Sequence, residues 1–312
     1  MIIRQAAFDG KEKHLKGGLH NHTTRSDGNL APDELIRLYY KNGYDFVALT
    51  DHYVYNRENF APDVPITIIP GCEGGGNVYV EHGFRTYHTV LIGKNDDSNG
   101  FSHDERVPNG NAFAPDGKIT GSDDYQPYLD MIHEKGNLTI YCHPEWSCTP
   151  ARCFENMKGN FAMEIWNSGC VIEDYIDRDA PCWDEILVQG KKIFGVATDD
   201  GHCEAHCCKG WVMVRAENHV DSILAALEKG AFYSSTGPKI YDFYMDGNTM
   251  HLKCDPASMI RIHSDVIPIA VRGENMTDYE IEFGQKRTYC RVTVTDAEGR
   301  MAWTNPIFFD ED

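Results

Sequence analysis

The chain has 312 residues, and 29 lysine and arginine side chains against 48 aspartate and glutamate side chains give it a formal net charge of −19. Hydrophobic residues make up 41% and charged residues 25%, as in a packed globular protein, which excludes general disorder. The acidic balance argues against duplex nucleic acid as a partner. The longest apolar runs are strand-sized, so we expect neither a membrane-spanning segment nor a signal peptide.

The 11 cysteines lie at irregular spacings between Cys72 and Cys290. An odd number of cysteines without the regular spacing of a disulfide framework is typical of reduced thiols in a chain of this size. We therefore expect a cytoplasmic location. The cluster of Cys203, Cys207 and Cys208 lacks a Cys-x-x-Cys pair. Its spacing suits buried thiols on a helical turn better than a separate zinc site.

Predicted strands and helices alternate from about residue 19 to residue 235. The first helix is expected to begin near residues 31–34, where Pro32 and two acidic residues suit a first turn, and to end at Gly43. Apolar periodicity then predicts strands at 46–50, 66–69, 88–92, 138–141, 162–166, 193–197 and 212–214, and helices at 123–134, 181–189 and 220–229. This α/β alternation is typical of parallel strands with crossover helices, in an open sheet or a barrel.

The pattern changes after Gly237-Pro238. From residue 239 to residue 312, short alternating strands are separated by turn signals such as Asp246-Gly247-Asn248, which indicates a small antiparallel β module. We therefore predict two domains, residues 1–238 and residues 239–312. The module carries no cluster of ligand-type side chains, which favours a packing role or a dimerisation surface that would make the protein a homo-oligomer.

Side chains that bind metals or protons lie mostly at the ends of the predicted strands. The set is His20, His22, Asp27, Asp51, His52, Glu73, His88, His143, Asp199, Asp200 and His202. Residues at the carboxyl ends of successive barrel strands converge on one face, and so many imidazoles and carboxylates need cations among them. Each short motif alone is common in a structural role, as a core histidine or a turn cap. It is their combined order that favours a metal centre.

Several motifs stand in a fixed order along the chain: Gly18-Leu19-His20-Asn21-His22-Thr23, Ser26-Asp27-Gly28, Phe46-Val47-Ala48-Leu49-Thr50-Asp51-His52, Gly71-Cys72-Glu73, His88, His143-Pro144 and Asp200-Gly201-His202. Over about residues 15–240 this order resembles the PHP (polymerase and histidinol phosphatase) superfamily. Two further segments are similar to a branch that includes carbaryl-cleaving metallohydrolases. They are Phe232-Tyr233-Ser234-Ser235-Thr236-Gly237-Pro238 and Ala302-Trp303-Thr304-Asn305-Pro306-Ile307.

The resemblance implies a distorted seven-stranded (β/α) barrel of the TIM-like PHP type, followed by the β module, with two or three divalent metal ions. It implies a first metal on His20, His22, Glu73 and Asp200, a second on Glu73, His88 and His143, and a third on Asp27, His52 and His202. Asp27 stands where some relatives have histidine. Asp51 and Asp199 would orient neighbouring ligands by hydrogen bonds. Mixed histidine and carboxylate ligation suits Zn, Mn or Fe.

The first hypothesis for function is a metal-dependent phosphoesterase that cleaves a small phosphate ester. The catalytic set would be His20, His22, Glu73, His143 and Asp200, and a hydroxide bridging two metals would be the nucleophile. The second hypothesis keeps the site and cleaves a carbamate, ester or amide, with hydrolysis of a phosphate ester favoured over that of a carbon–nitrogen bond. A third, of another class, is a non-catalytic metal-bound module of a larger assembly, against which the complete ligand set weighs.

Contacts to a small-molecule substrate are less sharply indicated. Arg25 could clamp a phosphate or be a solvated loop arginine. Asn167 follows a predicted strand on the same face, and Trp146 could either stack on a substrate or simply pack. Gly74-Gly75-Gly76 is expected to let the backbone approach the metals closely rather than to bind a nucleotide.

Overall fold

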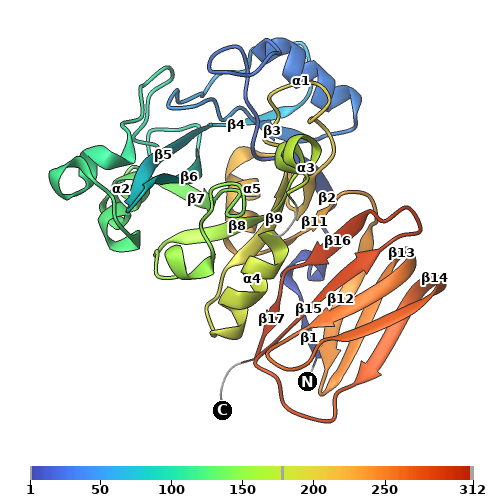
Figure 1. Cartoon of the computed structure of the whole chain (residues 1–312). Coiled ribbons are helices and arrows are strands. Elements are labelled where there is room, and N and C mark those ends of the chain that lie inside the picture. Colours follow the sequence, from blue (N-terminus) through green and yellow to red (C-terminus); the bar gives the residue numbers. More distant parts are fainter. Residues whose placement is uncertain (1, 177–178, 310–312) are drawn as a thin grey trace.

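The computed structural model describes residues 2–176 and 179–309, which form a mixed α/β protein (Figure 1). Its α-helices are α1 (Pro32–Lys41), α2 (Ser122–Glu134), α3 (Ser168–Asp174), α4 (Asp179–Val188) and α5 (Val220–Glu228). The first strands are β1 (Ile2–Arg4), β2 (His14–Gly18), β3 (Phe46–Ala48), β4 (Thr67–Ile69), β5 (Gly71–Val80), β6 (Gly83–Gly93), β7 (Asn137–Tyr141), β8 (Asn160–Asn167) and β9 (Phe194–Thr198). The remaining strands are β10 (Trp211–Arg215), β11 (Phe232–Ser235), β12 (Ile240–Asp246), β13 (Thr249–His263), β14 (Ile269–Glu282), β15 (Tyr289–Thr295), β16 (Met301–Thr304) and β17 (Ile307–Phe308).

The helices and buried strands predicted before residue 238 are present, with bounds shifted by a few residues. Helix α1 begins as its sequence indicates, with Pro32 in its first turn, and the Glu34 carboxylate accepts the backbone N–H of Ala31 at 2.9 Å. Helix α3 and the long hairpin of β5 and β6 were not predicted. No helix of the described ranges is long and apolar enough to cross a membrane.

The strands divide into two sheets. One has the order β5-β6-β7-β8-β9, and the other follows β1-β12-β13-β15-β16-β11-β10-β2-β3-β4, with β14 on β13 and β17 on β15. Strands β2, β3 and β4 are parallel, as are β7, β8 and β9, whereas β5, β6 and β7 run antiparallel. The predicted seven-stranded barrel is therefore not confirmed, because no ladder between the described strands completes a ring.

Two interruptions explain why the ring stays open. Pro70 separates β4 from β5, and proline has no N–H to give to a ladder. The second interruption is at β9, the last strand of the five-stranded sheet, which contacts β11 through a side chain. Ser234 Oγ of β11 accepts the Ala197 N–H at 3.0 Å and donates to the Gly195 carbonyl at 2.9 Å. Asn305 Oδ1 accepts the Gly195 N–H at 3.0 Å. These backbone groups of β9 are thus satisfied without a strand partner.

The two sheets nevertheless share an interior. One hydrophobic core takes fully buried side chains from strands of both sheets. They include Phe46 of β3, Ile69 of β4, Val90 of β6, Ile140 of β7, Val196 of β9 and Val212 of β10. Because these strands pack around one core, the segments that follow β2, β3, β7 and β9 lie close together, and they carry most of the predicted ligands.

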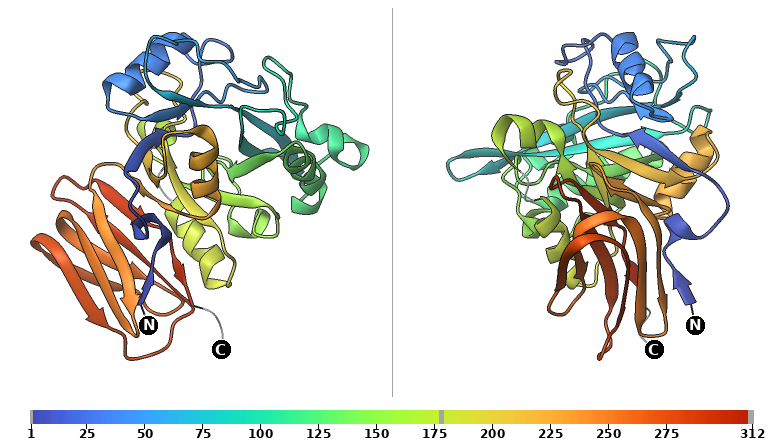
Figure 2. Two further views of the ribbon diagram at one scale, coloured as in Figure 1. Left: turned by 180° about the vertical axis from the view of Figure 1, so that it is seen from behind. Right: turned by 90° about the vertical axis from the view of Figure 1, so that its right-hand side faces the viewer.

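Strands β12 to β17 stand to one side of the other elements, in orange and red (Figures 1 and 2). Their own core includes Phe243, Ile260 and Val292. Strand β1 pairs antiparallel with β12, and β16 pairs with β11. The predicted domain boundary after Pro238 falls between β11 and β12. It stays a prediction, because backbone ladders cross between the two parts of the chain.

Candidate metal centre

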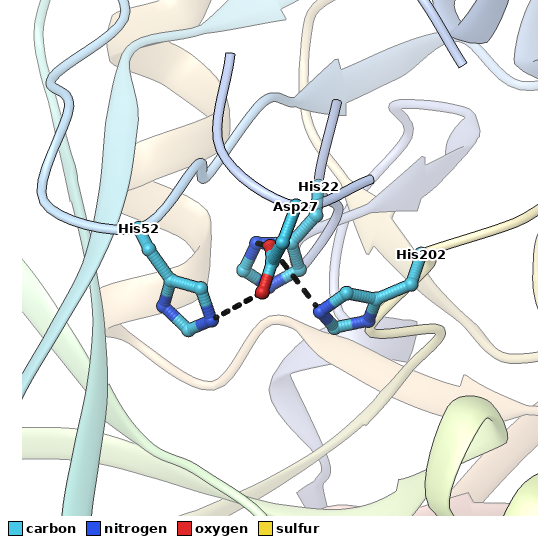
Figure 3. A group of neighbouring side chains, drawn as sticks. All are labelled: His22, Asp27, His52 and His202. Atoms are coloured by element: carbon cyan, nitrogen blue, oxygen red, sulfur yellow. Dashed lines mark ion pairs between the residues drawn. The ribbon is translucent and has the colours of Figure 1, made fainter. Parts of the chain in front are cut away.

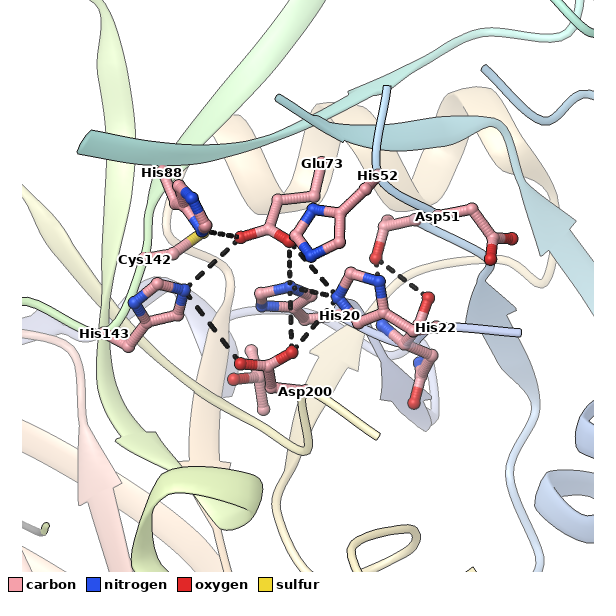
Figure 4. A network of polar contacts seen from close by, with 12 residues as sticks. His20, His22, Asp51, His52, Glu73, His88, Cys142, His143 and Asp200 are labelled. Atoms are coloured by element: carbon pink, nitrogen blue, oxygen red, sulfur yellow. Dashed lines mark hydrogen bonds and ion pairs between the residues drawn. The ribbon is translucent and has the colours of Figure 1, made fainter. Parts of the chain in front are cut away.

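The structure brings the nine predicted metal ligands into one cluster of polar side chains (Figures 3 and 4). Most follow a strand: His20, His22 and Asp27 follow β2, His52 follows β3, His143 follows β7, and Asp200 and His202 follow β9. Glu73 and His88 instead lie inside the hairpin of β5 and β6. Glu73 is 1% exposed and stands at the middle of the cluster.

The first group of ligand atoms is formed by His20, His22, Glu73 and Asp200. Oε2 of Glu73 lies 3.3 Å from His20 Nε2 and 3.2 Å from His22 Nε2. Oδ1 of Asp200 lies 3.4 Å and 3.1 Å from the same two nitrogens, which are themselves 3.2 Å apart. Ligand atoms about 2.1 Å from a tetrahedral metal are about 3.4 Å apart, so these separations fit one ion among the four side chains.

The second group uses the other oxygen of the same carboxylate. Oε1 of Glu73 lies 2.9 Å from His88 Nδ1 and 3.3 Å from His143 Nε2. Oδ2 of Asp200 lies 4.0 Å from the same nitrogen of His143. The two oxygens of Glu73 therefore face two different sets of histidines, which is the arrangement of a carboxylate that bridges two cations.

The third group surrounds Asp27 (Figure 3). One carboxylate oxygen of Asp27 lies 3.5 Å from His202 Nε2, and the other lies 3.5 Å from His52 Nε2. One ligand atom from each of these residues and from His22 all lie within 4.8 Å of one another. His52 also connects this group to the first two, because its Nδ1 lies 3.0 Å from Glu73 Oε2.

Glu164 of β8 accepts hydrogen bonds from one member of each of the first two groups. This residue was not predicted from the sequence. Its Oε1 accepts the Nδ1–H of His20 at 2.7 Å, and its Oε2 accepts the backbone N–H of His143 at 2.8 Å. The hydrogen bond to Nδ1 leaves the Nε2 lone pair of His20 directed at the ligand cluster. A single carboxylate within an otherwise apolar strand was the available signal, because an unpaired charge is rarely buried.

The two aspartates predicted to orient ligands accept hydrogen bonds from loop groups, and Asp51 reaches the ring of His22 through Ser26. Asp51 accepts hydrogen bonds from Thr23 and from the hydroxyl of Ser26, which lies 3.4 Å from His22 Nδ1. Asp199 accepts the hydroxyl of Tyr39 at 2.6 Å and three successive backbone N–H groups of residues 208–210. Burial raises the pKa of Asp199, although these donors oppose that effect.

Carboxylates and imidazoles stabilise each other's charges across the cluster. Burial opposes ionisation of Glu73, but His88, His52 and His20 hold its pKa well below the usual range. Burial likewise opposes protonation of His202, but the hydrogen bond to Asp27 raises its pKa to about 9. A divalent cation that binds here competes with protons on these histidines.

A cavity of about 300 Å³ opens over the cluster, at the lower end of the usual range for small ligands. Trp146 lines it, with its ring centroid 5.0 Å from that of His143. Asn167 is buried and donates to Asp200 Oδ2 at 3.0 Å. Arg25 does not line it, since its guanidinium is bound to Asn56 and Asp104.

The triple-glycine segment lies in the hairpin of β5 and β6. A Cβ at Gly75 would overlap the carbonyl oxygen of Tyr87 and the ring of His88, and one at Gly74 would overlap the hydroxyl of Tyr128. The close approach of its backbone to the metals stays a prediction. The cluster of Cys203, Cys207 and Cys208 supplies no group of ligand atoms close enough to hold a metal within the described part of the chain.

No protein-family model matches the sequence, and no curated protein matches it. A two-domain protein from Bacteroides vulgatus, said to contain a predicted PHP-like metal-dependent phosphoesterase, is 15% identical with a TM-score of 0.49, over 95% of this chain and 96% of that one. An amidohydrolase from Chromobacterium violaceum is 13% identical with a TM-score of 0.38, over 60% and 88%. A candidate metal-dependent phosphoesterase from Bifidobacterium adolescentis is 14% identical with a TM-score of 0.37, over 70% and 98%. The function proposed below therefore rests on the site itself.

Proposed function

We propose that the protein is a metal-dependent hydrolase of the PHP type and that its substrate is a small phosphate ester. The observation that carries the proposal is the position of Glu73, whose two carboxylate oxygens face separate sets of histidines at 2.9–3.3 Å. A structural carboxylate needs only one such set. Two sets on one buried carboxylate are typical of sites that hold two cations together.

The donor atoms fit divalent Zn, Mn or Fe at two positions, with a third position around Asp27. Asp200 Oδ1 is buried without a hydrogen-bond partner, although it lies 3.1 Å from His22 Nε2. An unsatisfied carboxylate oxygen is costly to bury, and a bound cation would remove that cost. Bound divalent cations would supply an activated water and neutralise the charge that develops on the substrate.

The protein's own residues hold the site rigid and select small substrates. Glu164 orients His20, and Asn167 fixes Asp200 by donating to its Oδ2. The cavity of about 300 Å³ has a size that suits a small molecule. The branch related to carbaryl hydrolases, a cytoplasmic location and a homo-oligomer formed through the β module remain parts of this proposal. The described cysteines, all 11 of them unpaired, are consistent with a reducing compartment.

A second candidate is hydrolysis of a carbamate, ester or amide by the same site. The observation that favours it is the lining of the cavity, which includes no lysine or arginine among the described residues. Phosphate sites usually add such cations to the metal centre. A neutral acyl substrate would need none.

The test is phosphate release from an aryl phosphate, sugar phosphates and mononucleotides by protein loaded with Mn or Zn. We expect release that is lost in His143→Ala, whose ring nitrogen faces Glu73. His82→Ala is the matched control, because His82 lies in an exposed turn outside the cavity. Absence of release from a fully metallated sample, together with cleavage of a carbamate or ester panel, would replace the first candidate by the second.

A further inference from the structure

A second cavity lies between helix α4 and the strands of the β module. Its volume is about 720 Å³, against about 300 Å³ for the cavity over the cluster, and none of the nine predicted metal ligands lines it. Strands β13, β15 and β16 form one wall, and α4 with the end of β8 forms the other (Figure 1). A cavity of this volume between two parts of a fold is typical of small-ligand sites. The proposed hydrolysis makes no use of it.

The strand wall is the face of the β module that its own core leaves free. On β13 every second residue lines the cavity, namely Met259, Arg261 and His263, and the residues between them, Ile260 and Ile262, belong to the core. Strands β15 and β16 continue the same face in register. The sheet therefore buries one face in its own core and turns the other toward α4.

The opposite wall owes part of its apolar surface to an irregularity in β8. The pairing of β8 with β9 shifts in register between Glu164 and Trp166, so the consecutive residues Ile165 and Trp166 both line the cavity. The partly exposed ring of Trp166 lies 6.1 Å from that of Trp303 between centroids, at an interplanar angle of 38°. Together with Met301, these indoles give the cavity an aromatic and thioether surface on which a flat ring can pack.

One cationic side chain of the cavity is left without a partner. Buried Arg291 donates from Nε to Asp184 Oδ1 at 2.8 Å, and the other oxygen of Asp184 lies 3.0 Å from His263 Nδ1. Arg261 is exposed and forms no ion pair within residues 2–176 and 179–309. Glu185 stands at the edge, since it also lines a separate hollow. A free guanidinium beside apolar surface is a favourable partner for a carboxylate.

We propose that this cavity is a second small-molecule site, which binds a planar aromatic carboxylate. The ring packs against Trp166 and the methionines, and the carboxylate faces Arg261. Indoles and thioethers favour an aromatic ring over an alkyl chain, because both make contacts with a ring that add to the burial of apolar area. The inference is independent of the proposed function, since no predicted metal ligand takes part.

The test is calorimetric titration of metal-loaded protein with 2-naphthoate and with 2-naphthamide, which has nearly the same shape and no charge. We expect 2-naphthoate to bind about tenfold more tightly, as one charge-assisted hydrogen bond gives. In Arg261→Met the preference should fall to less than about threefold. Arg106→Met removes an exposed arginine that lies outside the cavity, and it should keep the full preference.

Two further variants locate the bound ligand, because a carboxylate also has affinity for metal ions. Val188→Trp fills the cavity from a 54% exposed position of α4, and it should weaken binding of both ligands by about tenfold or more. His143→Ala disturbs the metal centre and should leave the binding of both unchanged. Circular dichroism confirms that each variant is folded.

Equal affinity for the two ligands, or no measurable binding of either, would overturn the inference. Loss of 2-naphthoate binding in His143→Ala would assign the carboxylate to the metal centre instead. A dimer that Val188→Trp dissociates, seen by size-exclusion chromatography with light scattering, would show that a second copy of the chain covers the cavity. Either of these results would also remove the proposed site.

Discussion

Glu164 accepts a hydrogen bond from Nδ1 of His20 at 2.7 Å. The same carboxylate accepts the backbone N–H of His143 at 2.8 Å, so one buried side chain of β8 fixes a member of each of the first two ligand groups. Both hydrogen bonds need an acceptor, and only an ionised carboxylate accepts at both oxygens. The position of the metal centre is therefore tied to the middle of a strand that contributes no predicted ligand.

Glu164→Gln should weaken metal binding by about 10- to 100-fold, the usual effect of losing such a supporting acceptor. Glutamine keeps the shape of glutamate but turns one acceptor into a donor that faces either His20 or the backbone. Competition with a chromophoric chelator measures the change. Glu185→Gln, at an exposed position of α4, is the control. Unchanged affinity in Glu164→Gln would show that the rings are held by packing alone.

Glu73→Gln should remove two equivalents of bound metal, whereas His88→Ala and Asp27→Asn should each remove one. The reason is that the two oxygens of Glu73 face separate ligand groups, while each of the other residues belongs to one group. Elemental analysis of desalted protein counts the ions, and circular dichroism confirms that each variant is folded. The same loss in all three variants would argue for a single shared ion.

Metal binding should release protons, and the affinity should rise with pH. The pKa of His202 is raised to about 9 by Asp27, so at pH 7 the imidazole is protonated and must lose its proton to bind a cation. The gain in affinity with pH should level off above about pH 9. Titration calorimetry in buffers of different ionisation enthalpy counts the protons. Asp27→Asn, which removes the carboxylate that raises this pKa, should release fewer.

The sequence predicted the order of elements and the chemistry of the candidate site better than it predicted the connections between strands. Strand ends such as those before His52 and His143 are marked by apolar runs followed directly by polar residues, and this local signal is strong. The sheet stays open at β9, where the side chains of Ser234 and Asn305 bind backbone groups of that strand. Both residues lie in segments that resemble a family branch, but no local pattern predicts the backbone groups that their side chains bind.

Glu164 was not predicted from the sequence for a similar reason. The role of Glu164 becomes apparent only when β8 is placed beside His20 and His143. For Arg25, in contrast, the sequence suggested a contact to the substrate that the structure does not show. Its position three residues after His22 pointed to the substrate, but Asn56 and Asp104 lie within its reach and hold it outside the cavity. Side-chain direction is set by such tertiary partners rather than by spacing.

Arg291→Met should lower the free energy of unfolding by about 2–3 kcal/mol in urea titrations. Arg291 is 1% exposed, donates from Nε to Asp184 at 2.8 Å, and lies over the ring of Trp183, so the variant leaves Asp184 poorly compensated. Arg300→Met, which breaks a pair at a 55% exposed side chain, is the control. It should cost less than about 1 kcal/mol, as exposed pairs usually do. Equal losses of unfolding free energy in the two variants would mean that burial adds nothing to the stability of the Arg291–Asp184 pair.

The pairing of β1 with β12 has a consequence for how the chain is made. Ile2, Ile3 and Arg4 lie opposite Asp246, Met245 and Tyr244, so during synthesis β1 waits for a partner some 240 positions later. At translation rates of about 5–20 residues per second, that wait is on the order of 10–50 s. During it, β12 and its neighbours have not been synthesised, and the edge that β1 will cover does not exist. A protein fused ahead of Ile2 would lie beside this late-formed edge and slow the pairing of β1 with β12.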